Sequence, residues 1–84
     1  MPGWEDNSKF DPRSGGKVYE VRGNFNQGDV IGHIARDPEN MHLWQVVEGK
    51  VETFGSSEFF HVYKVVDGGF SSGYNAINWL RDRK

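Results

Sequence analysis

The sequence predicts an α+β fold, an antiparallel sheet of four to five short strands with one C-terminal helix packed on one face. The 84 residues include eleven glycines and twelve aromatic residues, a combination typical of short strands joined by tight turns. Several segments alternate apolar and polar residues, as half-buried strands do. Only the last segment repeats apolar residues at the helical spacing. A small β-barrel with a terminal helix is the alternative architecture.

Residues 1–16 are expected to form an irregular N-terminal arm, followed by a single α+β domain over residues 17–84. The arm is rich in Pro, Gly, Ser and Asn and has no periodicity. Trp4 and Phe10 are its aromatic residues and could anchor it on an apolar surface. A chain of this size buries only about 60–65% of its unfolded surface, so one core is expected.

Turn residues divide the middle of the chain into strands. Gly32, inside one of these strands, predicts a bulge or a close contact. Glu48-Gly49 is typical of a two-residue hairpin turn. Asp67-Gly68-Gly69 is expected to end the longest strand. The expected strands are Lys17–Arg22, Val30–Arg36, Leu43–Val47, Lys50–Phe54 and Glu58–Val66.

The final segment predicts a helix, because Ala76, Ile77 and Leu80 fall on one face at the helical period. Ser71 or Ser72 is expected to cap its N-terminus. The basic residues near its C-terminal end complement the helix dipole.

The segment Glu58–Val66 is largely apolar on both sides, whereas a sheet covered on one side alternates apolar with polar residues. A helix of about ten to twelve residues covers one side only. We expect the second side to be covered by curling of the sheet, by the N-terminal arm or by another protein chain. One side carries Phe59, His61, Tyr63 and Val65, and the other carries Phe60, Val62, Lys64 and Val66.

These features predict a small non-catalytic protein-binding module. Residues 37–58 hold five carboxylates against one lysine, and aromatic anchors rimmed by charge concentrate binding energy at interfaces. An accessory or inhibitory protein of a phage or mobile element is one form of this hypothesis. A homo-oligomeric structural protein is a further alternative. The predicted contact residues are Trp44, Glu48, Glu52, Phe54, Phe59, Phe60 and Tyr63.

A nucleic-acid-binding domain is the main alternative. The segment from Tyr63 through Gly68-Gly69-Phe70-Ser71, followed by Ala76-Ile77 and Trp79-Leu80, resembles the strand-to-helix end of AP2-type and integrase arm-type domains. The resemblance covers under a quarter of the chain. It implies a three-stranded sheet that enters the major groove of DNA.

The sequence departs from those families in the strands that would face DNA. The families carry several Arg and Trp residues there, whereas this chain carries Glu48, Glu52 and one lysine, Lys50. Carboxylates repel the phosphate backbone. The residues that would contact nucleic acid are Lys17, Arg22, Arg36, Lys64, Arg81, Arg83 and Lys84.

No catalytic or metal-binding pattern is recognisable in the chain. It has no cysteine, and His33, His42 and His61 lack the spacing of a metal motif. The serine pairs lie in turns without a Gly-x-Ser-x-Gly frame. The glycine-rich stretch 67–73 lacks the lysine of a phosphate-binding loop. We therefore expect no enzyme activity, no metal and no cofactor.

The location of the protein is expected to be cytoplasmic, without membrane association. No stretch approaches the ~18 apolar residues of a membrane helix. The first residues lack the basic start and apolar centre of a signal peptide. The net charge of −2 provides no general attraction to nucleic acid or anionic lipid.

Overall fold

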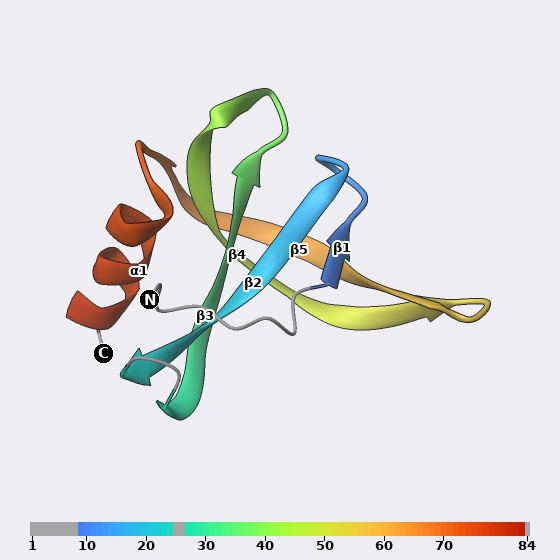
Figure 1. Ribbon diagram of the computed structural model, residues 1–84, viewed down its shortest axis with the longest axis horizontal. Coiled ribbons are helices and arrows are strands. Elements are labelled where there is room, and N and C mark those ends of the chain that lie inside the picture. The colour runs from blue at the N-terminus through green and yellow to red at the C-terminus, as the bar shows by residue number, and fades with distance from the viewer. Residues whose placement is uncertain (1–8, 25–26, 84) are drawn as a thin grey trace.

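The computed structural model describes residues 9–24 and 27–83. It confirms the predicted fold class, a five-stranded antiparallel sheet with one C-terminal helix packed against it (Figure 1). The elements in chain order are β1 (Lys9–Asp11), β2 (Gly16–Asn24), β3 (Gln27–Asp37), β4 (Asn40–Phe54), β5 (Ser57–Phe70) and α1 (Gly73–Asp82).

The sheet closes into a ring. Consecutive strands pair antiparallel, and β1 also pairs in parallel with β5, through a single pairing of Phe10 with Phe59. β1 lies within the segment that we expected to be an irregular arm. All three of its residues pair with β2, and Phe10 also pairs with β5. Trp4, the other aromatic residue of the arm, lies outside the described residues.

The predicted hairpin turn at Glu48-Gly49 is wrong, because β4 runs through both residues without interruption. The pairing with β5 shifts register here, from Glu48 opposite Lys64 to Gly49 opposite Val62. A Cβ atom on Gly49 would collide with the main-chain oxygen of His61. The glycine therefore allows a close approach of two backbones at a bulge, not a chain reversal.

The reversal takes place at Gly55-Ser56, where Phe54 pairs with Ser57 across a two-residue turn. Gly55 has a φ of 65°, the left-handed conformation that such turns require. The resulting β4–β5 hairpin projects away from α1, at the opposite end of the molecule (Figure 1). β5 does not end at Asp67-Gly68-Gly69 but continues to Phe70.

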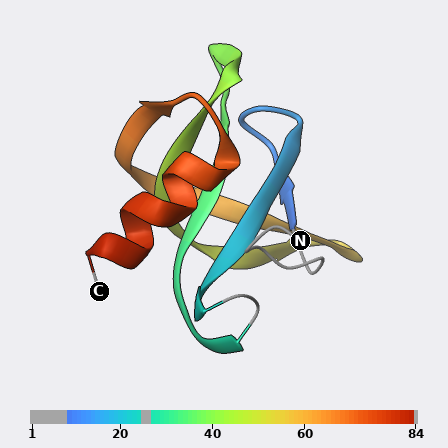
Figure 2. The same ribbon diagram turned by 60° about the vertical axis from the view of Figure 1, so that its left-hand side comes forward.

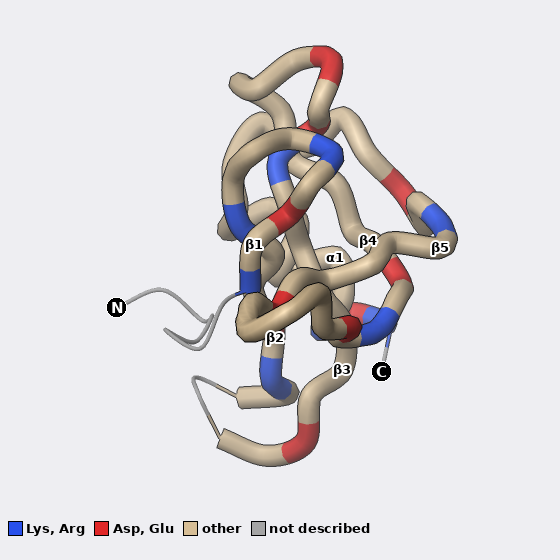
Figure 3. Tube along the Cα trace, turned by 90° about the vertical axis from the view of Figure 1, so that its right-hand side faces the viewer, with Lys and Arg blue, Asp and Glu red and all other residues tan. Residues whose placement is uncertain are grey.

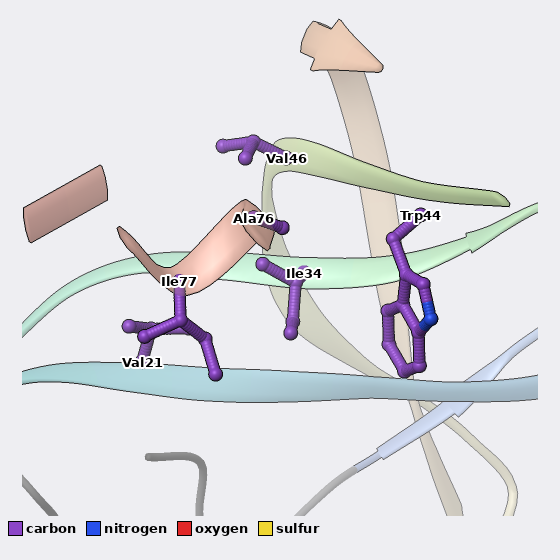
Figure 4. Packing of buried hydrophobic residues seen from close by; sticks show 6 residues of the cluster. All are labelled: Val21, Ile34, Trp44, Val46, Ala76 and Ile77. Atoms are coloured by element: carbon purple, nitrogen blue, oxygen red, sulfur yellow. The ribbon is translucent and has the colours of Figure 1, made fainter. Parts of the chain in front are cut away.

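Two buried clusters stabilise the ring. The first fills the space between the sheet and α1, which lies across one side of the ring (Figures 2 and 4). The second lies inside the ring and consists of Val18, Ala35, Val47 and Phe60, with Val62 packed against it. The first cluster consists of Val21, Ile34, Trp44, Val46, Ala76 and Ile77.

The helix begins as predicted. Ser72 is the N-cap, and its hydroxyl oxygen accepts a hydrogen bond from the backbone N–H of Asn75 at 3.1 Å. Gly32 provides the predicted close contact, because a Cβ atom there would lie 2.6 Å from a methyl group of Leu80. The missing side chain lets α1 pack closely on β3.

The turn between β1 and β2 is organised by a buried carboxylate that sequence analysis did not identify. Asp11 is fully buried and accepts hydrogen bonds from the Arg13 guanidinium at 3.1 and 3.2 Å and from the Ser14 hydroxyl at 2.9 Å. Arg13 also donates to Gln45 of β4 at 3.2 Å. This network ties the short strand β1 to the body of the sheet.

The two sides of β5 have different cover. Phe60 and Val62 face the interior of the ring, so the ring and not the helix covers this side. The helix packs instead near the end of the strand, against Val66 and Phe70. On the other side, Tyr63 and Val65 are exposed. Within residues 9–24 and 27–83, no helix has the length and apolar character that a membrane crossing requires.

Candidate functional site

The most exposed apolar group of side chains lies on the outer side of the β4–β5 hairpin and the adjoining β1. Phe54 is 81% exposed and Phe10 is 52% exposed. Together with Phe59, they line an open hollow of about 630 Å³, which Pro12, Ser57 and Glu58 complete. Exposed aromatic rings around a hollow are typical of sites that receive an apolar side chain.

A second, more polar hollow of about 340 Å³ lies on the other side of Phe59. It shares Pro12 and Phe59 with the first hollow, and its other lining residues are Arg13, Glu52, Phe60, His61 and Val62. We call the combined surface the hairpin face. It is formed by Phe10, Pro12, Glu52, Phe54, Phe59, His61 and Tyr63.

The polar part of the hairpin face is organised around Glu52. Its Oε2 atom lies 3.1 Å from Nδ1 of His61 and accepts a hydrogen bond from the Tyr63 hydroxyl at 3.3 Å. The His61 and Tyr63 rings are 4.7 Å apart. The Lys50 ammonium lies 5.9 Å from the centre of the Tyr63 ring.

These contacts shift two pKa values in directions that favour charge. The hydrogen bond from His61 is the main reason that the pKa of Glu52 lies below its ordinary value, with smaller contributions from Tyr63 and Lys50. The hydrogen bond with Tyr63 is the main reason that the pKa of Lys50 is raised. The hairpin face therefore presents an ionised carboxylate beside its aromatic rings at neutral pH.

Two predicted contact residues are buried and are therefore not part of the hairpin face. Trp44 is 7% exposed and belongs to the cluster beneath α1. Phe60 is 3% exposed and belongs to the cluster inside the ring, and it borders only the second hollow. Glu48 is exposed, but it lies at the bulge of β4, opposite Lys64.

The strand register explains why the remaining residues meet. Side chains directly opposite each other in an antiparallel pair lie on the same side of the sheet. Glu52 is opposite Phe59, and Phe54 is opposite Ser57, so alternate positions of both strands share the outer side. Placing the turn at Gly55-Ser56 would have revealed this face from the sequence. The misplaced turn at Glu48-Gly49 concealed it.

Phe10, Pro12 and His61 were not among the predicted contact residues. Phe10 was expected only to anchor the arm, because nothing local indicates that Lys9–Asp11 pairs with β5. For His61 a signal was available, because it alternates with Phe59 and Tyr63 along Glu58–Val66 and therefore shares their side of the strand.

The residues proposed for nucleic-acid contact are spread over β2, β3, β5 and α1, and acidic positions lie among them (Figure 3). Lys17 and Lys64 are exposed. Lys84 lies outside the described residues. The described arginines of this set contact other groups of the protein.

Each arginine of that set contacts another part of the chain. Arg22 donates to the carbonyl of Gly28 at 2.9 Å, and Arg81 donates to the carbonyl of Arg22 at 3.2 Å. The guanidinium groups of Arg36 and Arg83 lie over tryptophan rings, Arg36 at 4.7 Å from the Trp44 ring and Arg83 at 4.0 Å from the Trp79 ring.

A separate open groove of about 580 Å³ lies between α1 and the bend of β4. Its lining includes Trp79 and Leu80 of the helix, Gly49 of β4, Tyr63 of β5 and His33 of β3. Burial lowers the pKa of His33, and the negative charge of Glu20 opposes this effect only in part. His33 is therefore neutral at pH 7, with its ring 4.5 Å from that of Phe60.

Among residues 9–24 and 27–83, no three His, Asp or Glu side chains are arranged to hold a metal ion. His42 is exposed on β4. In comparisons with known proteins, no family model, no curated protein and no solved structure matches the chain. Any functional conclusion therefore depends on the surface chemistry of the chain itself.

Proposed function

We propose that this protein is a non-catalytic binding module that recognises another protein through the hairpin face. The observation that carries the proposal is the 81% exposure of Phe54 beside Phe10 and Phe59, around a hollow large enough for a side chain. Exposing the Phe10 and Phe54 rings beside the half-buried Phe59 costs stability, and a binding role accounts for that cost.

The chemistry of the partner follows from the two hollows. The hollow between Phe10, Phe54 and Phe59 fits one large apolar or aromatic side chain. The neighbouring hollow offers the ionised carboxylate of Glu52. The hairpin from Glu48 to Glu58 also has more carboxylates than lysines. The partner therefore presents an apolar anchor next to a lysine or arginine.

The experiment is a selection of a displayed library of random peptides on the immobilised protein. Enriched peptides are expected to share a large apolar residue close to a basic one. Phe54→Ser is expected to weaken their binding by at least tenfold, about 1.4 kcal/mol, because it removes one wall of the apolar hollow.

Tyr74→Ser serves as the matched control. Tyr74 is an aromatic residue that is 54% exposed on α1, at the other end of the molecule. This substitution is expected to leave peptide binding unchanged. Failure to enrich any peptide, or enrichment that is insensitive to Phe54→Ser, contradicts the proposal.

A further inference from the structure

The edge of β4 that faces away from β5 is paired along the first part of the strand and unpaired along the last part. From Asn40 to Val47 the strand pairs with β3, and from Trp44 to Phe54 it pairs with β5. Beyond Val47 no pairing to the β3 side exists among the described residues. The segment Glu48–Phe54 therefore has a strand edge without a partner strand in the part of the chain that the structure describes. Such an edge is a template for pairing with another chain.

The backbone groups that this edge presents follow from the turn. In a two-residue hairpin the pair next to the turn, here Phe54 and Ser57, exchanges hydrogen bonds, and the exchange recurs at every second pair. Glu52 and Lys50 are thus bonded toward β5. Val51 and Thr53 point their N–H and C=O groups away from β5, and Val51 is 46% exposed.

We propose that the Glu48–Phe54 edge pairs antiparallel with the same edge of a second copy of this chain, about a twofold axis through Val51. In this register Val51 meets Val51 of the second copy, and both residues point their hydrogen-bonding groups at the interface. Lys50 lies opposite Glu52 of the second copy, and Glu52 lies opposite its Lys50. Opposite charges directly across an antiparallel pair stabilise it.

The charges select this register. A register centred on Lys50 places Lys50 opposite Lys50 of the second copy, and a register centred on Glu52 places Glu52 opposite Glu52 of the second copy. Both registers bring like charges together. A register centred on Gly49 also pairs opposite charges, but it needs backbone edges of Val46 and Val47 that already pair with β3. Only the register centred on Val51 uses the whole open segment.

The existing contacts of Glu52 are compatible with the added ion pair. His61 and Tyr63 both contact Oε2, which leaves Oε1 to accept from the lysine of the second copy. Pairing of short strand edges buries less area than a standard stable interface, so the dimer is expected to be weak and concentration-dependent. The two hairpin faces would lie on the same side of the joined sheet.

The test is sedimentation velocity of the full chain over a series of concentrations, with two charge reversals. Lys50→Glu alone places like charges opposite each other at both symmetry-related positions, and Glu52→Lys alone does the same. Each variant is expected to raise the dimer dissociation constant about tenfold. An equimolar mixture of the two variants is expected to restore dimerisation, because every facing pair is then attractive.

Lys17→Glu and Glu39→Lys are the matched controls, since each reverses one exposed charge away from the β4 edge. Far-UV circular dichroism verifies that every variant is folded. A wild-type chain that stays monomeric at its highest soluble concentration overturns the proposal. A dimer that both reversals leave unchanged, or a mixture that fails to recover, also overturns it. None of these outcomes bears on peptide binding by the hairpin face.

Discussion

The two ends of the molecule use the same kinds of side chain in opposite ways. At the α1 end, Trp44, Phe70 and Trp79 pack in or against the cluster beneath the helix, and the Phe70 and Trp79 rings meet edge to face at 6.1 Å. At the hairpin end, Phe10 and Phe54 are more than half exposed. Composition alone does not distinguish these groups of aromatic residues.

The aromatic residues at the two ends differ in exposure because the topology places different elements over them. The helix follows β5 directly and returns over the ring, where Ala76 and Ile77 close the cluster. The hairpin extends past the ring, and among the described strands only β1 flanks it (Figure 1). Trp44 and Phe60 are therefore buried because α1 and the ring interior cover them, whereas Phe10 and Phe54 are exposed because neither does.

The largest expected effect tests this comparison on adjacent residues of β5. Phe60→Glu places a carboxylate inside the ring and is expected to reduce the free energy of unfolding by more than about 4 kcal/mol, enough to unfold a small domain. Phe59→Glu, on the hairpin face, is expected to cost less than about 1.5 kcal/mol. Urea denaturation followed by circular dichroism measures both. Equal losses would show that the hairpin face is part of the core.

A smaller effect is expected at the turn that holds β1 against the hairpin. Asp11→Ala removes the acceptor of the Arg13 and Ser14 hydrogen bonds and is expected to reduce the free energy of unfolding by about 2–4 kcal/mol. Asp29→Ala, at an exposed position of β3, is the control and should change it by less than about 0.5 kcal/mol. A loss no greater than that of the control would mean that the network contributes nothing to stability.

The smallest expected effect is a pH dependence at the α1 end. Burial lowers the pKa of His33 from 6.5, so below that pH the unfolded chain binds a proton more readily than the folded protein. Stability contributed by neutral His33 is therefore lost as the pH falls through 6.5 toward the lowered pKa. His33→Gln is expected to reduce the dependence of the melting temperature on pH in this window. His42→Gln, at an exposed position, is expected to leave that dependence unchanged. Identical profiles for both variants would exclude this role.

Local signals in the sequence predicted the parts of the fold that depend on neighbouring residues. The helix was predicted correctly because Ser72, Ala76 and Ile77 lie within a few residues of one another. Gly32 was predicted to mark a bulge or a close contact, and it lies beside a register shift of the β2–β3 pairing and against Leu80. These features need no knowledge of the remaining chain.

Features that depend on distant segments were not predictable in this way. Glu48-Gly49 reads as a turn, but Gly49 is required because the main chain of His61 lies against it. β1 was missed because its pairing depends on β2 and β5, not on Lys9–Asp11 alone. Trp44 was assigned to a docking surface because no local pattern shows that the helix will cover it.

The single pairing between Phe10 and Phe59 is the seam at which the ring closes. Thermal fluctuations are expected to part this seam before any other strand pair, since β4–β5 and β2–β3 pair over much longer stretches. An opened molecule would keep its helix and the cluster beneath it, but its sheet would be open and would have two unpaired edges, one on β1 and one on β5. At high concentration two opened molecules are expected to pair through these unpaired edges, so a weak β1–β5 pairing is expected to favour domain swapping.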